Sequence, residues 1–199
     1  MKIHSIAVAA LILTFCGCAS TSVKQTWKSP SYHGGPVGKT AVLVMSDRDF
    51  YRQAIENRFA DLLTKQGQSA FTTYDLFTLS AAKADRKAAG ARLRQAGADS
   101  VLVVRLVDSA YSSQRTHAAA AYTSSAEGYG YLAIGPDATW NSLQIDAYID
   151  STLYELASGE RLWSGLTRTA LREDTDTIAK IEPLAKKLFI LMRQDGVIH

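Results

Sequence analysis

The chain has 199 residues, of which 47% are hydrophobic and 21% are charged. This length and composition are typical of a single globular domain that buries its core without a disulfide or metal staple. The formal net charge is only +3, with both signs interspersed, which does not favour nucleic acid as a partner.

Residues 1–17 have the pattern of an export signal peptide. Lys2 forms a short basic region, and residues 6–15 are apolar apart from Thr14. An apolar run of about ten residues is too short to cross a hydrocarbon layer of ~30 Å as a helix. The small residue Gly17 followed by Cys18 resembles the bacterial lipobox, in which the chain is cleaved before a cysteine that receives diacylglycerol.

The lipobox resemblance implies a lipoprotein with diacylglycerol and an N-acyl chain, such as palmitate, on Cys18, and no other cofactor. Phe15 and Cys16 depart from the usual pattern, and Cys16 is the poorer site because bulky Phe15 precedes it. Ala19 after the cysteine implies an anchor in the outer membrane, with the domain facing the periplasm. The alternative is an ordinary secretory signal, cut after Ser20 and without lipid.

Residues 18–39 are rich in serine, glycine and proline and show little periodicity. This composition predicts a flexible tether with an r.m.s. span of roughly 25 Å, which would hold the domain away from the membrane. Residues 40–199 are then predicted to form one periplasmic α/β domain.

The first half of this domain alternates strands and helices. Residues 40–45 are a short apolar run typical of a buried strand, and Ser46 opens an S-x-x-D pattern typical of a helix start. Apolar residues then recur at helical spacing as far as Gly67, where a helix C-cap is expected. Further elements follow in chain order: a strand over 70–77, an alanine-rich helix over 80–96 that ends at Gly97, and a central strand over 100–107.

Residues 109–138 are dominated by serine, alanine, tyrosine and glycine, which predicts a long hairpin tip. Tyrosine offers rigid, amphipathic contact area, so the loop is a candidate partner-binding surface. A mobile loop without a function is the alternative. The candidate residues are Tyr111, Tyr122, Tyr129 and Tyr131.

The C-terminal third predicts a hairpin and a helix. Along 139–156 apolar and polar residues alternate, which is typical of an antiparallel strand with one wet face. A turn at 157–160 leads to a partner strand over 161–169, and the last helix carries Pro183, which should kink it or mark a restart. The apolar face is Leu143, Ile145, Ala147, Ile149 and Leu153; the polar face is Gln144, Asp146, Tyr148 and Asp150.

The predicted order is therefore β-α-β-α-β-β-β-α. It favours an α/β (α+β) fold, with one mixed sheet, a long C-terminal hairpin and a terminal helix. We expect helices on one face of this sheet, or on both faces near the first strands.

Several sequence patterns resemble catalytic or ligand-binding motifs but do not meet the requirements of those motifs. GGPVGKT at 34–40 lacks the first glycine of a P-loop, and it precedes a strand rather than a helix. Asp146 and Asp150 lie about 13 Å apart along a strand, too far for a glycosidase pair. Helix N-terminal charge preference accounts for an acidic cluster at Glu173, Asp174 and Asp176.

The mature histidines predict no metal or catalytic centre. His33, His117 and His199 fall in the tether, the loop and the terminus, without zinc-ligand spacing. Ser164 lies in W-S-G rather than in the G-x-S-x-G of a hydrolase. We therefore expect no catalytic, metal or cofactor residues.

The C-terminal pattern resembles a family of small uncharacterised lipoproteins of Gram-negative outer membranes. An acid at Glu155, a Ser158-Gly159 turn and the run Leu162 to Gly165 are followed by a helix ending in LMRQDGVI. The element order resembles the α/β core of the TolB amino-terminal domain, CsgG and LpoB. These resemblances imply a non-enzymatic envelope role, in binding or scaffolding an envelope protein. The alternatives are a hydrolase of envelope glycan or lipid, and a self-associating, ring-forming secretion subunit.

Overall fold

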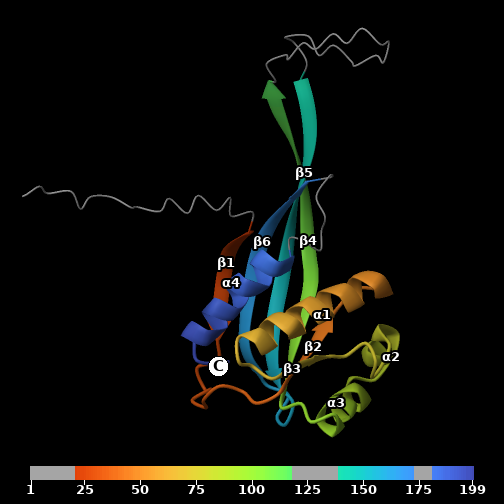
Figure 1. Ribbon diagram of the computed structural model, residues 1–199, viewed down its shortest axis with the longest axis vertical. Coiled ribbons are helices and arrows are strands. Elements are labelled where there is room, and N and C mark those ends of the chain that lie inside the picture. Colours follow the sequence, from red (N-terminus) through yellow and green to blue (C-terminus); the bar gives the residue numbers. More distant parts are fainter. Residues whose placement is uncertain (1–20, 118–138, 173–180) are drawn as a thin grey trace, which may run out of the picture.

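The computed structural model describes residues 21–117, 139–172 and 181–199, and it contains a mixed six-stranded sheet in the order β1-β6-β5-β4-β2-β3 (Figure 1). Strand β2 is parallel to its neighbours β3 and β4, and the other pairs are antiparallel. The strands are β1 (Thr21–Lys28), β2 (Thr40–Val44), β3 (Ala70–Thr72), β4 (Ser100–His117), β5 (Thr139–Glu155) and β6 (Arg161–Arg172).

Helices cover the two faces of the sheet unequally (Figure 1). Helices α1 (Asp49–Lys65) and α4 (Ile181–Gln194) pack on one face, where the Phe59 and Phe189 rings meet edge to face at 5.6 Å. Helices α2 (Leu79–Ala84) and α3 (Arg86–Gln95) pack on the other face, against Ala41 and Val101. The two cores are separate because successive strand residues point to opposite faces.

The predicted fold class is confirmed: one domain with a mixed sheet, a long C-terminal hairpin and a terminal helix. Gly67 and Gly97 end α1 and α3 with φ of 91° and 84°, a conformation that favours glycine at helix C-termini. Pro183 lies in the first turn of α4, where its missing N–H costs no helical hydrogen bond.

The prediction of a flexible tether is wrong for Thr21–Lys28, which form strand β1. This strand pairs antiparallel with β6, from Thr21 opposite Thr169 to Lys28 opposite Trp163. Lys187 Nζ donates to the Thr21 carbonyl oxygen at 3.1 Å and ties the start of the strand to α4. The pairing with β6 supplies backbone hydrogen bonds to this segment, and the composition of the segment alone does not reveal them.

Other element boundaries also differ from the sequence prediction. The strand predicted over 70–77 ends at Thr72, and Asp85 divides the helix predicted over 80–96 because its carboxylate caps α3 by accepting from Ala88 N. The expected Ser46 cap is absent: Ser46 Oγ instead contacts the backbone of Arg48, the residue before α1. Strand β4 extends to His117 rather than ending at 107.

A buried ion pair lies at the carboxyl ends of strands β2 and β3. Glu56 is 0% exposed and Arg52 is 2% exposed, and Arg52 Nε donates to Glu56 Oε1 at 2.9 Å. The same carboxylate accepts from the backbone N–H groups of Val44, Thr73 and Tyr74. In α/β proteins the carboxyl ends of parallel strands commonly receive a ligand. Here internal side chains occupy that position.

The residues that carry the family resemblance form one structural unit. Trp163 is fully buried, and its Nε1 donates to Asp195 Oδ2 at 2.7 Å, so the W-S-G and R-Q-D-G segments meet. The Trp163 ring lies where a Cβ on Gly165 would stand, which accounts for the glycine. Ser158 Oγ donates to Glu155 Oε2 at 2.6 Å inside the hairpin turn. The residues that carry the resemblance therefore hold the hairpin and the end of the terminal helix together, which is a structural role.

Candidate binding surface

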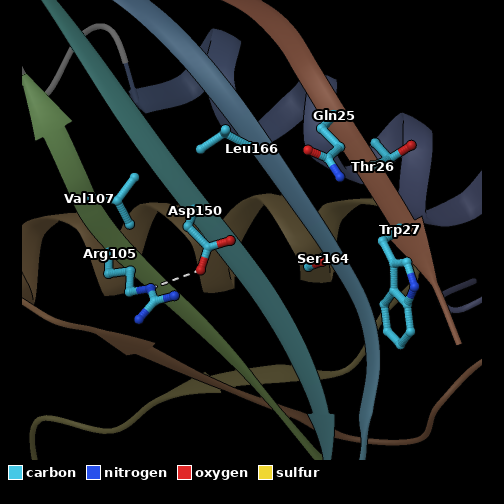
Figure 2. A pocket seen from close by; sticks show the side chains of 8 residues that line it. All are labelled: Gln25, Thr26, Trp27, Arg105, Val107, Asp150, Ser164 and Leu166. Atoms are coloured by element: carbon cyan, nitrogen blue, oxygen red, sulfur yellow. Dashed lines mark hydrogen bonds and ion pairs between the residues drawn. The ribbon is translucent and has the colours of Figure 1, made fainter.

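The second face of the sheet has an open part that no described helix covers. Helices α2 and α3 reach only the end of the sheet near β2 and the start of β4. Beyond them, β4, β5, β6 and β1 expose one continuous face, which we call the open face (Figure 2). A shallow depression of about 240 Å³ lies in it. Its lining residues are Gln25, Thr26, Trp27, Arg105, Val107, Asp150, Ser164 and Leu166.

An arginine–aspartate pair lies on the two central strands of the open face. Arg105 on β4 donates through Nε to Asp150 Oδ2 on β5 at 2.8 Å, and Figure 2 shows the two side chains meeting across the strands. Thr152 Oγ1 also donates to this carboxylate oxygen at 3.2 Å. The Arg105 side chain is 58% exposed, so its remaining N–H groups are available to an incoming acceptor.

A second pair lies further along the same face. Arg168 on β6 donates to Asp146 Oδ2 on β5 at 2.6 Å. This hydrogen bond, together with the negative charge of Asp146, raises the pKa of the Arg168 guanidinium above its usual value. Asp146 is only 8% exposed, so the prediction that places it on the wet face of its strand is wrong about its exposure. Arg168 Nε is buried and makes no hydrogen bond within the described part of the chain.

An aromatic residue stands at the edge of the open face. The Trp27 ring on β1 lies below the Arg161 guanidinium, which is 4.0 Å from the ring centroid. Gln25 and Thr26 from the same strand also line the depression. The open face thus combines an amphipathic ring, amide and hydroxyl groups, and arginine N–H donors. Such groups suit recognition by hydrogen bonding and stacking.

The carboxylates of the open face are arranged as ion-pair partners rather than as an acid–base pair. Asp146 and Asp150 each bind an arginine, and four strand residues separate them along β5 by about 13 Å. Across residues 21–117, 139–172 and 181–199, no group of three histidine, cysteine, aspartate or glutamate side chains is placed to hold a metal ion. Ser164 lies in this depression beside Trp27 and Leu166.

Most of the candidate site residues predicted from the sequence do not lie on the open face. Cys18, the acidic cluster at 173–176, and three of the four loop tyrosines, Tyr122, Tyr129 and Tyr131, lie outside the described residues. The fourth, Tyr111, lies within strand β4 opposite Ile145 rather than in a loop. His33 and His199 are exposed, and the GKT segment leads into β2, where Lys39 N donates to Asp99 Oδ2 at 2.8 Å.

The contribution of β1 to the open face was missed because its segment was interpreted as a tether. The signal that could have revealed it is the run TSVKQTWK, where Thr, Val and Trp give strand propensity next to a Ser/Gly/Pro-rich stretch. Arg105 lies in the strand predicted over 100–107, and the structure pairs it with Asp150 on the neighbouring strand.

Comparisons with known proteins give distant structural likenesses only. No family model matches the chain, and no curated protein matches it in sequence. A PelC dodecamer structure from Paraburkholderia phytofirmans is 10% identical, with a TM-score of 0.49, over 90% of this chain and 99% of that chain. The lipoprotein GNA1162 from Neisseria meningitidis is 14% identical, with a TM-score of 0.45, over 79% of this chain and 99% of that chain.

A minor lipoprotein from Acinetobacter baumannii is 11% identical, with a TM-score of 0.38, over 81% of this chain and 97% of that chain. Identities this low, with TM-scores below 0.5, establish neither a family nor a function for the chain. The expected likeness to TolB, CsgG and LpoB stays a prediction. Within the described ranges, no helix is both long enough and apolar enough to cross a bilayer.

Proposed function

We propose that the chain is a lipid-anchored protein of the bacterial cell envelope. Cys18 carries the lipid in the outer membrane, and the domain faces the periplasm. There it binds an envelope protein partner through the open face and catalyses no reaction. Diacylglycerol and an N-acyl chain on Cys18 are its only covalent additions, and it uses no cofactor.

The anchoring part of the proposal rests on the first 18 residues. A short basic region, an apolar run of about ten residues and Gly17-Cys18 fit a lipoprotein signal better than a membrane-spanning helix. Several acyl chains hold a protein firmly on a bilayer, because each buried CH₂ contributes about 0.8 kcal/mol. Only Ala19 and Ser20 separate the proposed anchor from strand β1.

The binding part rests on a single observation: within the described residues, no helix covers this face of β1, β6, β5 and β4. A sheet face without a covering helix is usually polar or is covered by a partner. This face is polar but not uniformly so: Trp27 and Leu166 flank the depression, and Val107 is 46% exposed. Arg105 adds exposed donors next to these apolar groups. Aromatic and arginine side chains are enriched among residues that dominate protein interfaces.

The pairing of the carboxylates argues against the hydrolase alternative. A general acid needs a raised pKa, and a general base must reach the proton that it removes. Asp150 accepts from Arg105 and Asp146 accepts from Arg168, so both carboxylates are engaged in ion pairs. The arrangement therefore suits charge-assisted binding better than proton transfer.

Site-specific photo-crosslinking in cells tests the binding proposal. A photoreactive residue at Ser164 should give a discrete adduct, whereas the same residue at Gln53, exposed on α1 on the opposite side of the sheet, should not. Arg105→Ala should weaken the Ser164 adduct several-fold while leaving the fold intact. Equal adducts from both positions, or an adduct only from Gln53, would show that the open face is not the binding surface.

A further inference from the structure

Helix α4 presents a basic line to solvent that also carries an exposed isoleucine. Its buried side is Leu184, Ala185, Leu188, Phe189 and Met192. Its outward side has Lys186, Ile190 and Arg193, and Ile190 is one of only four large hydrophobic residues exposed in the described part of the chain, at 52%. Basic side chains beside an exposed apolar group can contact the headgroups and the outer acyl region of an anionic membrane.

This line lies close to the proposed lipid anchor. Lys187 Nζ donates to the backbone oxygen of Thr21, so α4 contacts the first residue of β1. Cys18 precedes Thr21 by three residues, which span at most about 10 Å when fully extended. The anchor therefore cannot hold the domain far from the bilayer, and a surface beside Thr21 must lie near the lipid.

The charge of α4 suits an anionic surface. Residues 181–194 contain Lys186, Lys187 and Arg193 against Glu182, which is three positive charges minus one negative, or +2. Glu182 is also neutralised from the neighbouring helix, because it binds Arg58 of α1 as well as Lys186. Arg193 donates to Gln66 Oε1 and to the main-chain oxygen of His199, and its side chain is exposed on the outward side of the helix.

We propose that the outward line of α4 lies on the anionic headgroups of the membrane that holds Cys18. This inference rests on the proposed anchoring at Cys18. Because α4 and the open face lie on opposite sides of the sheet, contact between α4 and lipid turns the open face away from the membrane. Figure 1 shows α4 beside β1, in agreement with the hydrogen bond from Lys187 to Thr21. The short connection thus orients the domain as well as attaching it.

Two other orientations are possible for so short a connection. Strand β1 runs parallel to β5, so the chain before Thr21 leaves toward the end of the sheet from which β4 and β5 project. The domain could stand with that end on the membrane, or it could place the open face there. Neither orientation buries Ile190, and each gives a different labelling result.

Fluorescence quenching in vesicles tests the proposal. The full lipidated protein is added from detergent to vesicles of phosphatidylethanolamine and phosphatidylglycerol that contain a headgroup-attached quencher. Cys18 would carry lipid on its sulfur and Cys16 would be removed with the signal, so a single introduced cysteine is the only free thiol. The fluorophore is attached in turn to Ile190→Cys on α4, Ser164→Cys on the open face and Ser158→Cys in the hairpin turn.

We expect several-fold stronger quenching at position 190 than at positions 164 and 158. Lys186→Glu combined with Arg193→Glu should remove most of that difference in these vesicles, since each basic residue near an anionic surface contributes about 1 kcal/mol. Strong quenching at position 164, or none at position 190 in protein that floats with the vesicles, would overturn the orientation. Protein that does not float with the vesicles would instead overturn the anchoring at Cys18.

Discussion

The buried carboxylate of Glu56 gives a stringent test of how the domain is held together. Glu56→Ala removes the acceptor for Arg52 and for the backbone N–H groups of Val44, Thr73 and Tyr74. Arg52 is only 2% exposed, so the variant leaves a buried guanidinium without its counter-charge. These groups join α1 to the ends of β2 and β3, and we expect the loss to affect the whole domain.

The expected loss of stability in Glu56→Ala follows from the nearly complete burial of Arg52 and Glu56. Breaking a buried ion pair by removing one partner costs about 3–5 kcal/mol, because the remaining charge is desolvated and uncompensated. Domains are stable by only about 5–15 kcal/mol, so Glu56→Ala should consume a large part of the free energy of unfolding. At about 2–4 °C per kcal/mol for a domain of this size, the melting temperature should fall by roughly 6–20 °C.

Thermal and urea unfolding, followed by circular dichroism, measures this loss on the domain produced without its lipid. Asp61→Ala is the matched control: Asp61 also binds Arg58 and Lys65 on α1, but it is 44% exposed. Exposed pairs contribute about 1 kcal/mol or less. If Glu56→Ala were as mild as Asp61→Ala, the buried network would not have the stabilising role described above.

Three further changes test other parts of the fold. Asp195→Ala leaves the buried Trp163 Nε1 without an acceptor and should cost about 1–3 kcal/mol in urea unfolding, whereas a neutral result would mean that water replaces the carboxylate. Ile149→Asp places a charge against the core and should cost about 2 kcal/mol or more, and an unchanged melting temperature would mean that this face is exposed. The Lys186 hydrogen bond, and then Arg58, lower the pKa of Glu182, so its contribution to stability is present above the unfolded value and is lost as pH falls through the lower folded pKa. Glu182→Gln should therefore reduce the melting temperature at neutral pH but not in strong acid, and an equal reduction at both would show that its charge is irrelevant.

The C-terminal hairpin could be predicted because its alternation and turn are local. Residues 143–150 alternate between the apolar and the polar face, and Gly159 has a φ of 76° in the turn. Trp163 in the returning strand is fully buried. Leu143 and Ile145 belong to the predicted apolar face, but their burial lies outside the described side chains.

Strand β1 and the open face could not be predicted in the same way. The pairing of β1 with β6 joins residues about 140 positions apart, and its hydrogen bonds leave no local pattern beyond a few strand-forming residues. The open face exists because α2 and α3 are short and stay near β2, which depends on how the connections pack rather than on the strand residues themselves. The ion pair of Arg105 with Asp150 depends on the register of β4 and β5, which places the two residues opposite each other.

Mass spectrometry of the mature amino terminus tests the central claim most directly. The proposed anchoring predicts a protein that begins at Cys18, whose first tryptic peptide, ending at Lys24, carries the mass of diacylglycerol and one N-acyl chain. An unmodified peptide that begins after Ser20, or any mature terminus without lipid on Cys18, would contradict the account. In that case β1 would begin a secreted domain, and neither the anchor nor the membrane orientation would hold.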